Sequence, residues 1–284
     1  MKMAFLSKKI IFLFLLCCIY ACTDKRNVLE VKLISYNIRQ SGLADKDGEY
    51  KWENRKAATL NMIEKESPSV FGLQEALLEQ VEYIEQNCPK YSRIGVGRDD
   101  GKNAGEFMAI FYLKDKYKLL QQGTFWLSET PDTVSKGWDA DYFRIVTWVK
   151  LQGINTKKEF YYFNTHFDNI GEVARKESTK LVAEKIKEIA EKKANIIFGG
   201  DLNSAITDKI FNPLKKNMKI ARKCSTITDN KGTFNGFGSA PTSIILDHIF
   251  CKNIECKSFR TLDGDYGVPY ISDHYPIEFV FEIE

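Results

Sequence analysis

Short apolar runs alternate with amphipathic stretches along most of the chain, and this alternation predicts a mixed α/β fold. Apolar residues recur at helical spacing over 56–64 and 172–192, and a third helix is expected at 76–86. Runs rich in β-branched and aromatic residues predict strands at 31–37, 69–74, 107–112, 144–151, 160–165, 195–198, 243–250, 256–261 and 276–283. Strands grouped in hairpins with helices between them favour an α/β layered domain whose sheets carry the core.

The first residues follow a different pattern, that of an export signal. Three lysines precede an almost purely apolar run at 10–20, which is shorter than the roughly 20 residues a membrane-spanning helix needs and has the length of a signal-peptide core. The sequence Ile-Tyr-Ala-Cys ending at Cys22 is similar to the lipobox of bacterial lipoproteins. We therefore expect residues 1–21 to be a lipoprotein signal peptide, Cys22 to carry the lipid, and residues 22–27 to be a short tether. An ordinary cleaved signal peptide, with an incidental cysteine, is the alternative.

Lipidation would attach the protein to the bacterial cell envelope, facing the periplasm or the surface, through acyl chains rather than a spanning helix. It also changes the charge argument. The chain has 41 basic and 38 acidic residues, and residues 1–21 contain three of the lysines and no acid. The mature chain is therefore close to neutral, whereas proteins that bind nucleic acid non-specifically usually carry a basic excess.

Residues 28–284 show no repeat, low-complexity tract or Pro/Ser-rich linker, so we expect one catalytic domain and a monomer. The cysteines beyond the lipobox are Cys88, Cys224, Cys251 and Cys256. Their spacing is not that of a zinc site. Cys251 and Cys256 could join a hairpin through a disulfide, and free buried cysteines are equally compatible with the sequence.

Polar residues stand at or just beyond the ends of several predicted strands. They are Asn37, Glu75, His166, Asp201, Asn203, Asp247, Asp273 and His274. Ligands of layered α/β folds bind at strand ends, where loops converge. Carboxylate and amide oxygens suit Mg²⁺, which can activate water or neutralise phosphate oxygens, and histidine exchanges protons near neutral pH. Each residue alone is typical of a turn or a cap, so the order of the set carries the inference.

That order resembles the endonuclease/exonuclease/phosphatase superfamily, which includes deoxyribonucleases, abasic-site endonucleases, bacterial sphingomyelinases, inositol polyphosphate phosphatases and deadenylases. The matching motifs are S-Y-N-I-R around Asn37, G-L-Q-E ending in Glu75, N-T-H-F-D around His166, G-G-D-L-N-S around Asp201, I-L-D-H-I-F around Asp247 and S-D-H-Y-P around Asp273. The resemblance covers the whole mature chain. It implies a four-layer α/β sandwich, in which two mixed β-sheets pack face to face with helices outside.

The resemblance also implies roles for the carboxylates and amides. Glu75 would be the principal ligand of Mg²⁺, or of Mn²⁺ or another divalent cation. Asn37 and Asp273 would complete the metal shell directly or through water. Asp201 would orient or deprotonate the attacking water, and Asn203 would hold a phosphate oxygen.

The two strand-end histidines would then work in pairs with acids. By resemblance, His274 stabilises or protonates the phosphate and is oriented by Asp247, while His166 is the second histidine of the site. Glu106 occupies the place of an acid that pairs with this second histidine in the deoxyribonucleases. His248 departs from the family pattern, which often has tyrosine here. Because alternate strand residues point to opposite faces, we expect it to lie outside the site.

Two arginines are candidates for substrate binding. Arg144 resembles a phosphate-contacting arginine of the same enzymes, with a surface strand-end arginine as the alternative. Arg98 lies in the glycine-rich, charged segment 97–106, which is either a substrate-facing loop or a surface turn. The connection that follows, 124–143, holds three aromatic residues, Trp126, Trp138 and Tyr142. These could stack on a substrate or simply pack the loop.

The function expected from these features is metal-dependent hydrolysis of phosphate esters, as a phosphodiesterase or a phosphomonoesterase, on small, sugar or lipid phosphates. A secreted nuclease is the alternative, and the near-neutral charge of the mature chain does not favour nucleic acid as the partner. A non-catalytic surface binding protein that keeps the fold is an alternative of another class. The resemblance defines the chemistry better than the substrate.

Overall fold

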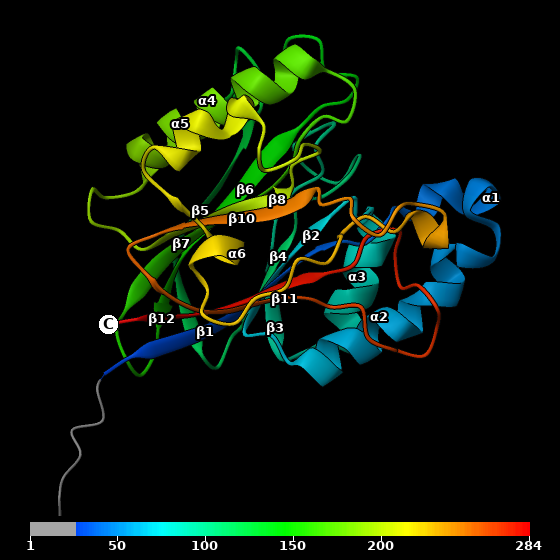
Figure 1. Cartoon of the computed structure of the whole chain (residues 1–284), viewed down its shortest axis with the longest axis horizontal. Coiled ribbons are helices and arrows are strands. Elements are labelled where there is room, and N and C mark those ends of the chain that lie inside the picture. Colours follow the sequence, from blue (N-terminus) through cyan, green and yellow to red (C-terminus); the bar gives the residue numbers. More distant parts are fainter. Residues whose placement is uncertain (1–26) are drawn as a thin grey trace, which may run out of the picture.

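The computed structural model describes residues 27–284 as two six-stranded mixed sheets (Figure 1). The first sheet has the order β11-β12-β1-β2-β4-β3. Its strands are β1 (Leu29–Asn37), β2 (Val70–Gln74), β3 (Tyr91–Ile94), β4 (Ile110–Leu113), β11 (Glu255–Thr261) and β12 (Ile277–Ile283). The second sheet has the order β5-β6-β7-β8-β10-β9. Its strands are β5 (Tyr117–Trp126), β6 (Ile145–Gly153), β7 (Glu159–His166), β8 (Ile196–Asp201), β9 (Lys219–Ile220) and β10 (Asp247–Lys252).

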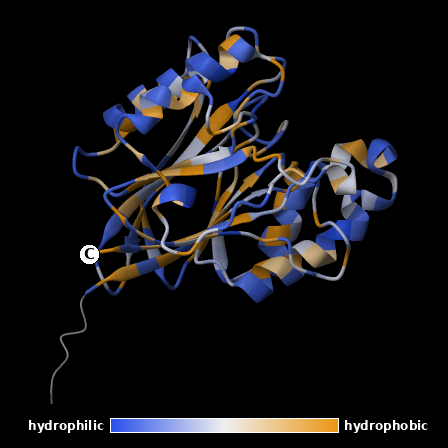
Figure 2. Cartoon of the chain, viewed as in Figure 1, coloured by the Kyte–Doolittle hydropathy of each residue, from blue (hydrophilic) through white to orange (hydrophobic). Residues whose placement is uncertain are grey.

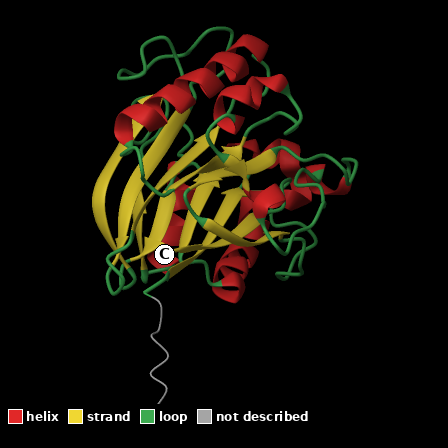
Figure 3. Cartoon of the chain, turned by 60° about the vertical axis from the view of Figure 1, so that its left-hand side comes forward, coloured by secondary structure: helices red, strands yellow, loops and turns green. Residues whose placement is uncertain are grey.

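Helices cover the outer faces of both sheets (Figures 1 and 3). The α-helices are α1 (Ala44–Asp47), α2 (Trp52–Glu66), α3 (Leu78–Asn87), α4 (Glu172–Ile189), α5 (Asn212–Lys215) and α6 (Ala221–Cys224). Apolar residues of α2 and α3 pack on the first sheet, and those of α4 and α5 pack on the second. The expected four-layer sandwich of two mixed sheets with helices outside is confirmed. None of the helices within residues 27–284 has the length and apolar character that crossing a membrane requires.

The central core lies between the two sheets, where strand residues of alternate positions meet. Leu33, Val70, Tyr162, Ile197 and Phe279 belong to this one buried cluster. Figure 2 shows the consequence, with strands mostly apolar and helices polar on their outer sides. From Leu33 onwards β1 is buried on both faces, because helices cover the side that faces away from the other sheet.

The topology gathers eight strand termini at one edge of the sandwich. Strands β1 and β2 are parallel, as are β7 and β8. Their outer neighbours run antiparallel to them: β12 beside β1, β4 beside β2, β6 beside β7 and β10 beside β8. The carboxyl ends of four strands therefore lie beside the amino ends of four others, and residues far apart in sequence converge there.

The strand predictions miss β3, β5 and β9, and the strand predicted at 243–250 starts too early. Residues 117–126 form β5, although the sequence pattern indicated a connection from residue 124 onwards. This strand lies at a sheet edge and has a register irregularity between Leu119 and Gln121, so its burial does not alternate regularly. Residues 243–246 are not a strand, because β10 begins only at Asp247. The helix expected to reach residue 192 ends at Ile189.

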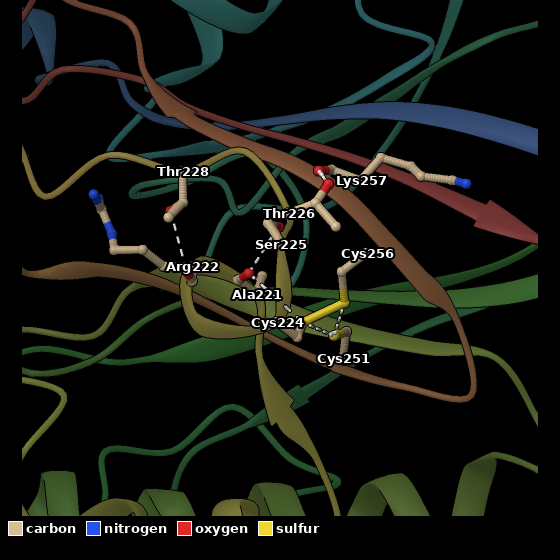
Figure 4. The surroundings of a disulfide bond; sticks show 9 residues. All are labelled: Ala221, Arg222, Cys224, Ser225, Thr226, Thr228, Cys251, Cys256 and Lys257. Carbon is tan, nitrogen blue, oxygen red and sulfur yellow. Dashed lines mark hydrogen bonds between the residues drawn. A yellow bond between two sulfur atoms is a disulfide. The ribbon is translucent and has the colours of Figure 1, made fainter.

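The cysteines pair differently from the hairpin disulfide considered above. Cys224 and Cys256 form a disulfide beside Cys251 (Figure 4). Cys251 and Cys88 are free and buried. Cys251 and Cys256 lie in strands of different sheets, so no hairpin pairing of β10 with β11 exists for a disulfide to join. The predicted signal peptide and the lipidated Cys22 lie outside the described residues.

Candidate active site

The two sheets meet at the site through Asn37, the last residue of β1. Its side-chain amide Nδ2 donates to Glu75 Oε1 at 2.9 Å and to Asp201 Oδ2 at 3.0 Å. Glu75 directly follows β2 and has a left-handed backbone with φ of +63°. This conformation is costly for a side chain larger than glycine, and it turns the chain away from the sheet at the site. Asn37 thereby joins a carboxylate of the first sheet to one of the second.

Asp201, at the end of β8, lies between two histidines. Its Oδ2 atom is 3.4 Å from Nε2 of His166 and 3.5 Å from Nε2 of His274. The other oxygen, Oδ1, accepts from the backbone N–H of Asn203 at 3.0 Å. Burial disfavours the charged carboxylate and raises the pKa of Asp201 to about 7. A carboxyl group whose pKa is close to neutral pH is suited to exchange protons with a bound water molecule.

His274 is held by a second buried carboxylate. Its Nδ1 lies 2.8 Å from Oδ2 of Asp247, the first residue of β10, and the Phe234 ring contacts its face edge-on at 5.0 Å. Burial opposes the charged imidazolium, but the carboxylates of Asp247 and Asp201 outweigh that effect and raise the pKa of His274 well above its usual value. His274 is therefore a cation at neutral pH.

His166, at the end of β7, has the opposite electrostatic setting. Burial, reinforced by Arg144 and Arg98, lowers its pKa well below the usual value, so the imidazole is neutral. Its Nε2 lies 3.0 Å from Nδ2 of Asn203. Its Nδ1 has no hydrogen-bond partner among the described residues and lies 3.9 Å from Oε2 of Glu106. Since Asn203 can donate to Nε2, the Nδ1 atom is the one that carries the proton in this network.

Two arginines, Arg98 and Arg144, lie on the His166 side of the site. Arg98 Nη1 pairs with Glu106 Oε2 at 2.5 Å, and Arg144 Nε pairs with Asp168 Oδ2 at 3.3 Å. Both guanidinium groups lie against the Tyr142 ring, at 5.2 and 5.4 Å from its centroid. Burial raises the pKa of Glu106 to about 7. Nη1 of Arg144 is buried and has no hydrogen-bond partner within residues 27–284, so it is available to an anionic ligand.

Segment 97–106 and the aromatic connection 124–143 come together around these two arginines. The Trp126 indole N–H donates to the Arg98 carbonyl oxygen at 2.8 Å and is buried, so this residue packs the loop rather than facing a substrate. Tyr142 is 46% exposed and covers both arginines. Tyr142 is thus placed beside the arginines to meet a ligand, whereas Trp126 packs the loop and Trp138 is half-buried.

Acidic groups gather around Glu75, where a metal ion is expected. Glu75, His166 and Asp201 have ligand atoms within 4.8 Å of one another. Asp273 stands apart from this group, with Oδ2 at 3.3 Å from Nη1 of Arg39. Burial and the nearby Glu75 carboxylate raise the pKa of Asp273. The carboxylates of Glu75 and Asp201, together with the Asn37 amide, match the oxygen donors that hard divalent cations prefer.

Several residues that the sequence motifs did not single out support this site. The Arg39 guanidinium is held by Asp47, at 2.9 Å, in addition to Asp273. Gln40 donates through Nε2 to Glu106 at 3.2 Å. Arg39 and Asp168 both lie inside quoted motifs, so their position was the available signal. His248 donates through Nε2 to the Ser204 carbonyl oxygen at 2.9 Å and is buried outside the cluster around Asp201, as predicted.

Comparison with known proteins identifies the family of this chain. Residues 34–274 match the model of the Endonuclease/Exonuclease/phosphatase family. A solved endonuclease/exonuclease/phosphatase of Bacteroides vulgatus is 36% identical, with a TM-score of 0.85, and the match covers 90% of this chain and 100% of that one. A mannosyl-6-phosphatase of Bacteroides thetaiotaomicron is also 36% identical, with a TM-score of 0.84, over 88% of this chain and 99% of that one.

More distant relatives extend the same likeness. An uncharacterized protein of Acanthamoeba polyphaga mimivirus is 29% identical over 89% of this chain and all of its own length. The catalytic domain of human nocturnin is 18% identical, with a TM-score of 0.70 over 91% of this chain and 97% of its own, and shares the fold. The chain thus belongs to the Endonuclease/Exonuclease/phosphatase family, whose members are hydrolases that act on phosphate esters.

Proposed function

We propose that the protein is a metal-dependent phosphomonoesterase that acts on small sugar phosphates. The observation that carries this proposal is Asp201, a buried carboxyl held between a neutral and a cationic histidine. The mannosyl-6-phosphatase relative supports a sugar phosphate as the substrate class. Arg98 and Arg144 beside the Tyr142 ring also support a sugar phosphate, because the guanidinium groups can bind the phosphate and the exposed ring can contact the sugar.

The residues of the chain divide the reaction between them. Asp201 orients a water molecule and accepts its proton as the water attacks phosphorus. His274, charged and held by Asp247, donates to a phosphate oxygen on which negative charge increases. Arg144 offers its unpaired Nη1 to the phosphate. Asn203 was predicted to hold a phosphate oxygen, but its two amide hydrogens are directed at His166 Nε2 and the Phe167 carbonyl oxygen, so it positions the neutral histidine instead.

A divalent cation fits the acidic side of the site, where Glu75, with Asn37 and Asp273 as further candidates, would hold it. We propose Mg²⁺, with Mn²⁺ as the alternative, because the donors are carboxylate and amide oxygens. When bound, the cation supplies charge neutralisation to the phosphate and its leaving oxygen. In this role it also relieves the repulsion between Glu75 and Asp273.

Hydrolysis of nucleic acid is the second candidate function. It is the reaction of several members of the superfamily that the sequence resembles. Against it stands the balance of charge, since the chain beyond residue 21 carries 38 basic and 38 acidic residues. Phosphodiester polymers are held largely by basic side chains, so this balance favours a small substrate.

A substrate panel with Mg²⁺ tests the proposal. We expect turnover of mannose 6-phosphate or another sugar monophosphate, and little on plasmid DNA, sphingomyelin or a bis(p-nitrophenyl) phosphate diester. Nicking of DNA without monoesterase activity would contradict the proposed substrate class. Asp201→Asn should lower kcat by about 10²–10⁴-fold while circular dichroism and the melting temperature show a folded protein.

A matched pair of variants separates an enzyme from a binding protein that keeps the fold. Glu75→Ala should abolish turnover and weaken Mg²⁺ binding measured by calorimetry. His248→Gln, which changes a buried histidine outside the cluster, should retain activity if the variant folds. If no substrate shows Mg²⁺-dependent turnover, or if Glu75→Ala retains it, the catalytic proposal fails.

We also propose export and lipid anchoring at Cys22, in the bacterial cell envelope. The support is the basic start, the apolar run and the lipobox-like Ile-Tyr-Ala-Cys. Membrane fractionation of a Cys22→Ser variant tests it, with release from the membrane fraction as the expected result. Unchanged fractionation would contradict the anchor and leave the catalytic proposal untouched.

A further inference from the structure

Three cysteine sulfurs lie together at a place that the catalytic proposal does not use. Cys224 ends α6, Cys251 lies in β10 and Cys256 lies in β11 (Figure 4). The Sγ atom of Cys251 is 3.6 Å from the Sγ of Cys224 and 3.6 Å from the Sγ of Cys256. The cluster lies four residues along β10 from Asp247, or about 13 Å at the rise of a β-strand, so it is separate from the active site.

The third cysteine is not placed to exchange with the disulfide between the other two. Thiol–disulfide exchange needs the attacking sulfur in line with the bond that breaks, on the far side of one sulfur atom. Cys251 is equally distant from both disulfide sulfurs, so it lies beside the bond. It is also completely buried. The geometry therefore groups three sulfurs around one point rather than along one line.

Such grouping is the geometry of thiolate ligands around a soft metal ion. Zinc–sulfur bonds are about 2.3 Å long, so the sulfurs of a tetrahedral zinc site lie roughly 3.8 Å apart. The two non-bonded separations of 3.6 Å are close to this spacing. Within residues 27–284 the only other free cysteine, Cys88, lies in the separate cluster between the first sheet and its helices.

We propose that, once the Cys224–Cys256 disulfide is reduced, the three cysteines bind one thiophilic metal ion of the Zn²⁺ class. A dithiol reductant supplies two electrons and two protons to the S–S bond and is itself oxidised to a disulfide. The metal ion then replaces the protons of the three thiols, which pass to solvent as three metal–sulfur bonds form. The half-buried Cys224 provides the route of entry, and a water molecule takes the fourth position.

Cobalt(II) is the probe that separates this site from the oxygen-rich active site. The protein is reduced with a dithiol, freed of it under anaerobic conditions, and titrated with Co²⁺. We expect about one equivalent of Co²⁺ to produce near-ultraviolet sulfur-to-cobalt charge-transfer absorption, which Zn²⁺ then displaces. Oxygen and nitrogen ligands do not produce this band. The oxidised protein should produce none, because only one of the three sulfurs is then a free thiol.

Cysteine variants give the decisive comparison. Cys251→Ser should bind Co²⁺ more than about tenfold more weakly, since loss of even a supporting partner of a metal ligand costs that much. Cys88→Ser is the matched control and should leave the titration unchanged. Circular dichroism checks that each variant folds, and Cys224→Ser, which should show the same loss, decides the matter if Cys251→Ser does not fold.

Three results would overturn the proposal. They are absence of the charge-transfer band in the reduced wild-type protein, an unchanged titration of a folded Cys251→Ser or Cys224→Ser variant, and disulfide-bonded Cys251 in peptide maps of the unreduced protein. The last result would show that the cluster exchanges disulfides instead.

Discussion

The two histidine sides of the active site have almost the same geometry and opposite electrostatics. Nε2 of His166 and Nε2 of His274 lie 3.4 and 3.5 Å from the same oxygen of Asp201. Around His166 the charged neighbours include Arg98 and Arg144, and its pKa falls. Around His274 they are carboxylates, and its pKa rises. Two copies of one residue type are thus a neutral imidazole and a cation on either side of one carboxyl.

The charged side chains around each imidazole ring therefore determine whether a histidine of this site can act as a neutral acceptor or as a cation. A neutral imidazole accepts a hydrogen bond through one nitrogen and donates through the other, so His166 is suited to positioning water and Asn203. An imidazolium donates from both nitrogens, so His274 is suited to an anionic phosphate oxygen.

Among variants of the two histidine sides, the largest effect should follow removal of the cationic histidine. His274→Gln removes the charge that faces the phosphate, and we expect kcat/KM to fall by about 10²–10⁴-fold. His166→Gln keeps a polar side chain on the neutral side, and its loss should be at the low end of that range. Steady-state kinetics on a sugar phosphate with Mg²⁺ make the comparison, and a larger loss in His166→Gln would reverse the assignment of the two sides.

The next effect concerns the partner of the cation. Asp247→Asn removes the carboxylate that raises the pKa of His274, so the imidazolium should be lost at lower pH. Because the charged form is the active one, wild-type activity falls as pH rises through the raised pKa, and the variant should lose activity at a lower pH. We expect about a 10–100-fold loss at neutral pH. A pH–rate profile whose alkaline limb does not move would contradict this origin of the charge.

Glu106 offers a test on the neutral side. Its pKa is raised to about 7 in the folded protein. Between the ordinary pKa of a glutamate and pH 7, the metal-free protein therefore takes up a proton when it folds. The contribution of Glu106 to the free energy of unfolding decreases as pH rises through that window. Glu106→Gln should therefore melt at least as high as wild type at pH 8, at about 2–4 °C per kcal/mol of relief. Addition of Mg²⁺ should raise the melting temperature of both proteins. A variant that melts lower at pH 8 would show that the carboxylate stabilises the fold.

The smallest effect should come from Tyr142, which lies over both arginines. Tyr142→Ala removes two cation–π contacts at a partly exposed position, and we expect KM to rise about two- to fivefold with little change in kcat. Tyr142→Phe keeps the ring and is the matched control, expected to behave like wild type. A kcat effect in Tyr142→Ala that equals the His166→Gln loss would place this ring in catalysis rather than substrate binding.

Much of this site could be predicted from the sequence, because parallel strands deliver their carboxyl ends to one edge. Asn37, Glu75, His166 and Asp201 end such strands or follow them directly, and the structure brings them together. The metal-binding role of Asp273 stays a prediction, since its carboxylate faces Arg39 in the described structure. The electrostatic difference between the histidines could not be predicted, because it depends on which charges lie behind each ring.

Other features were hidden for physical reasons that differ. Strand β5 lies at an edge and carries an irregular register, so its apolar positions do not alternate. The Cys224–Cys256 pairing depends on α6 and β11 approaching in space, which spacing along the chain does not reveal. Tyr142 was one of three candidate aromatics, and only its position over the arginines distinguishes it.

The most direct test of this division is the protonation state of the histidine side chains. The chain has three histidines, so a ¹⁵N NMR titration of the imidazoles resolves them, with His166→Gln, His248→Gln and His274→Gln spectra for assignment. We predict that at pH 7 His274 is an imidazolium while His166 and His248 are neutral. A neutral His274, or a His166 that titrates near its ordinary pKa, would contradict the account.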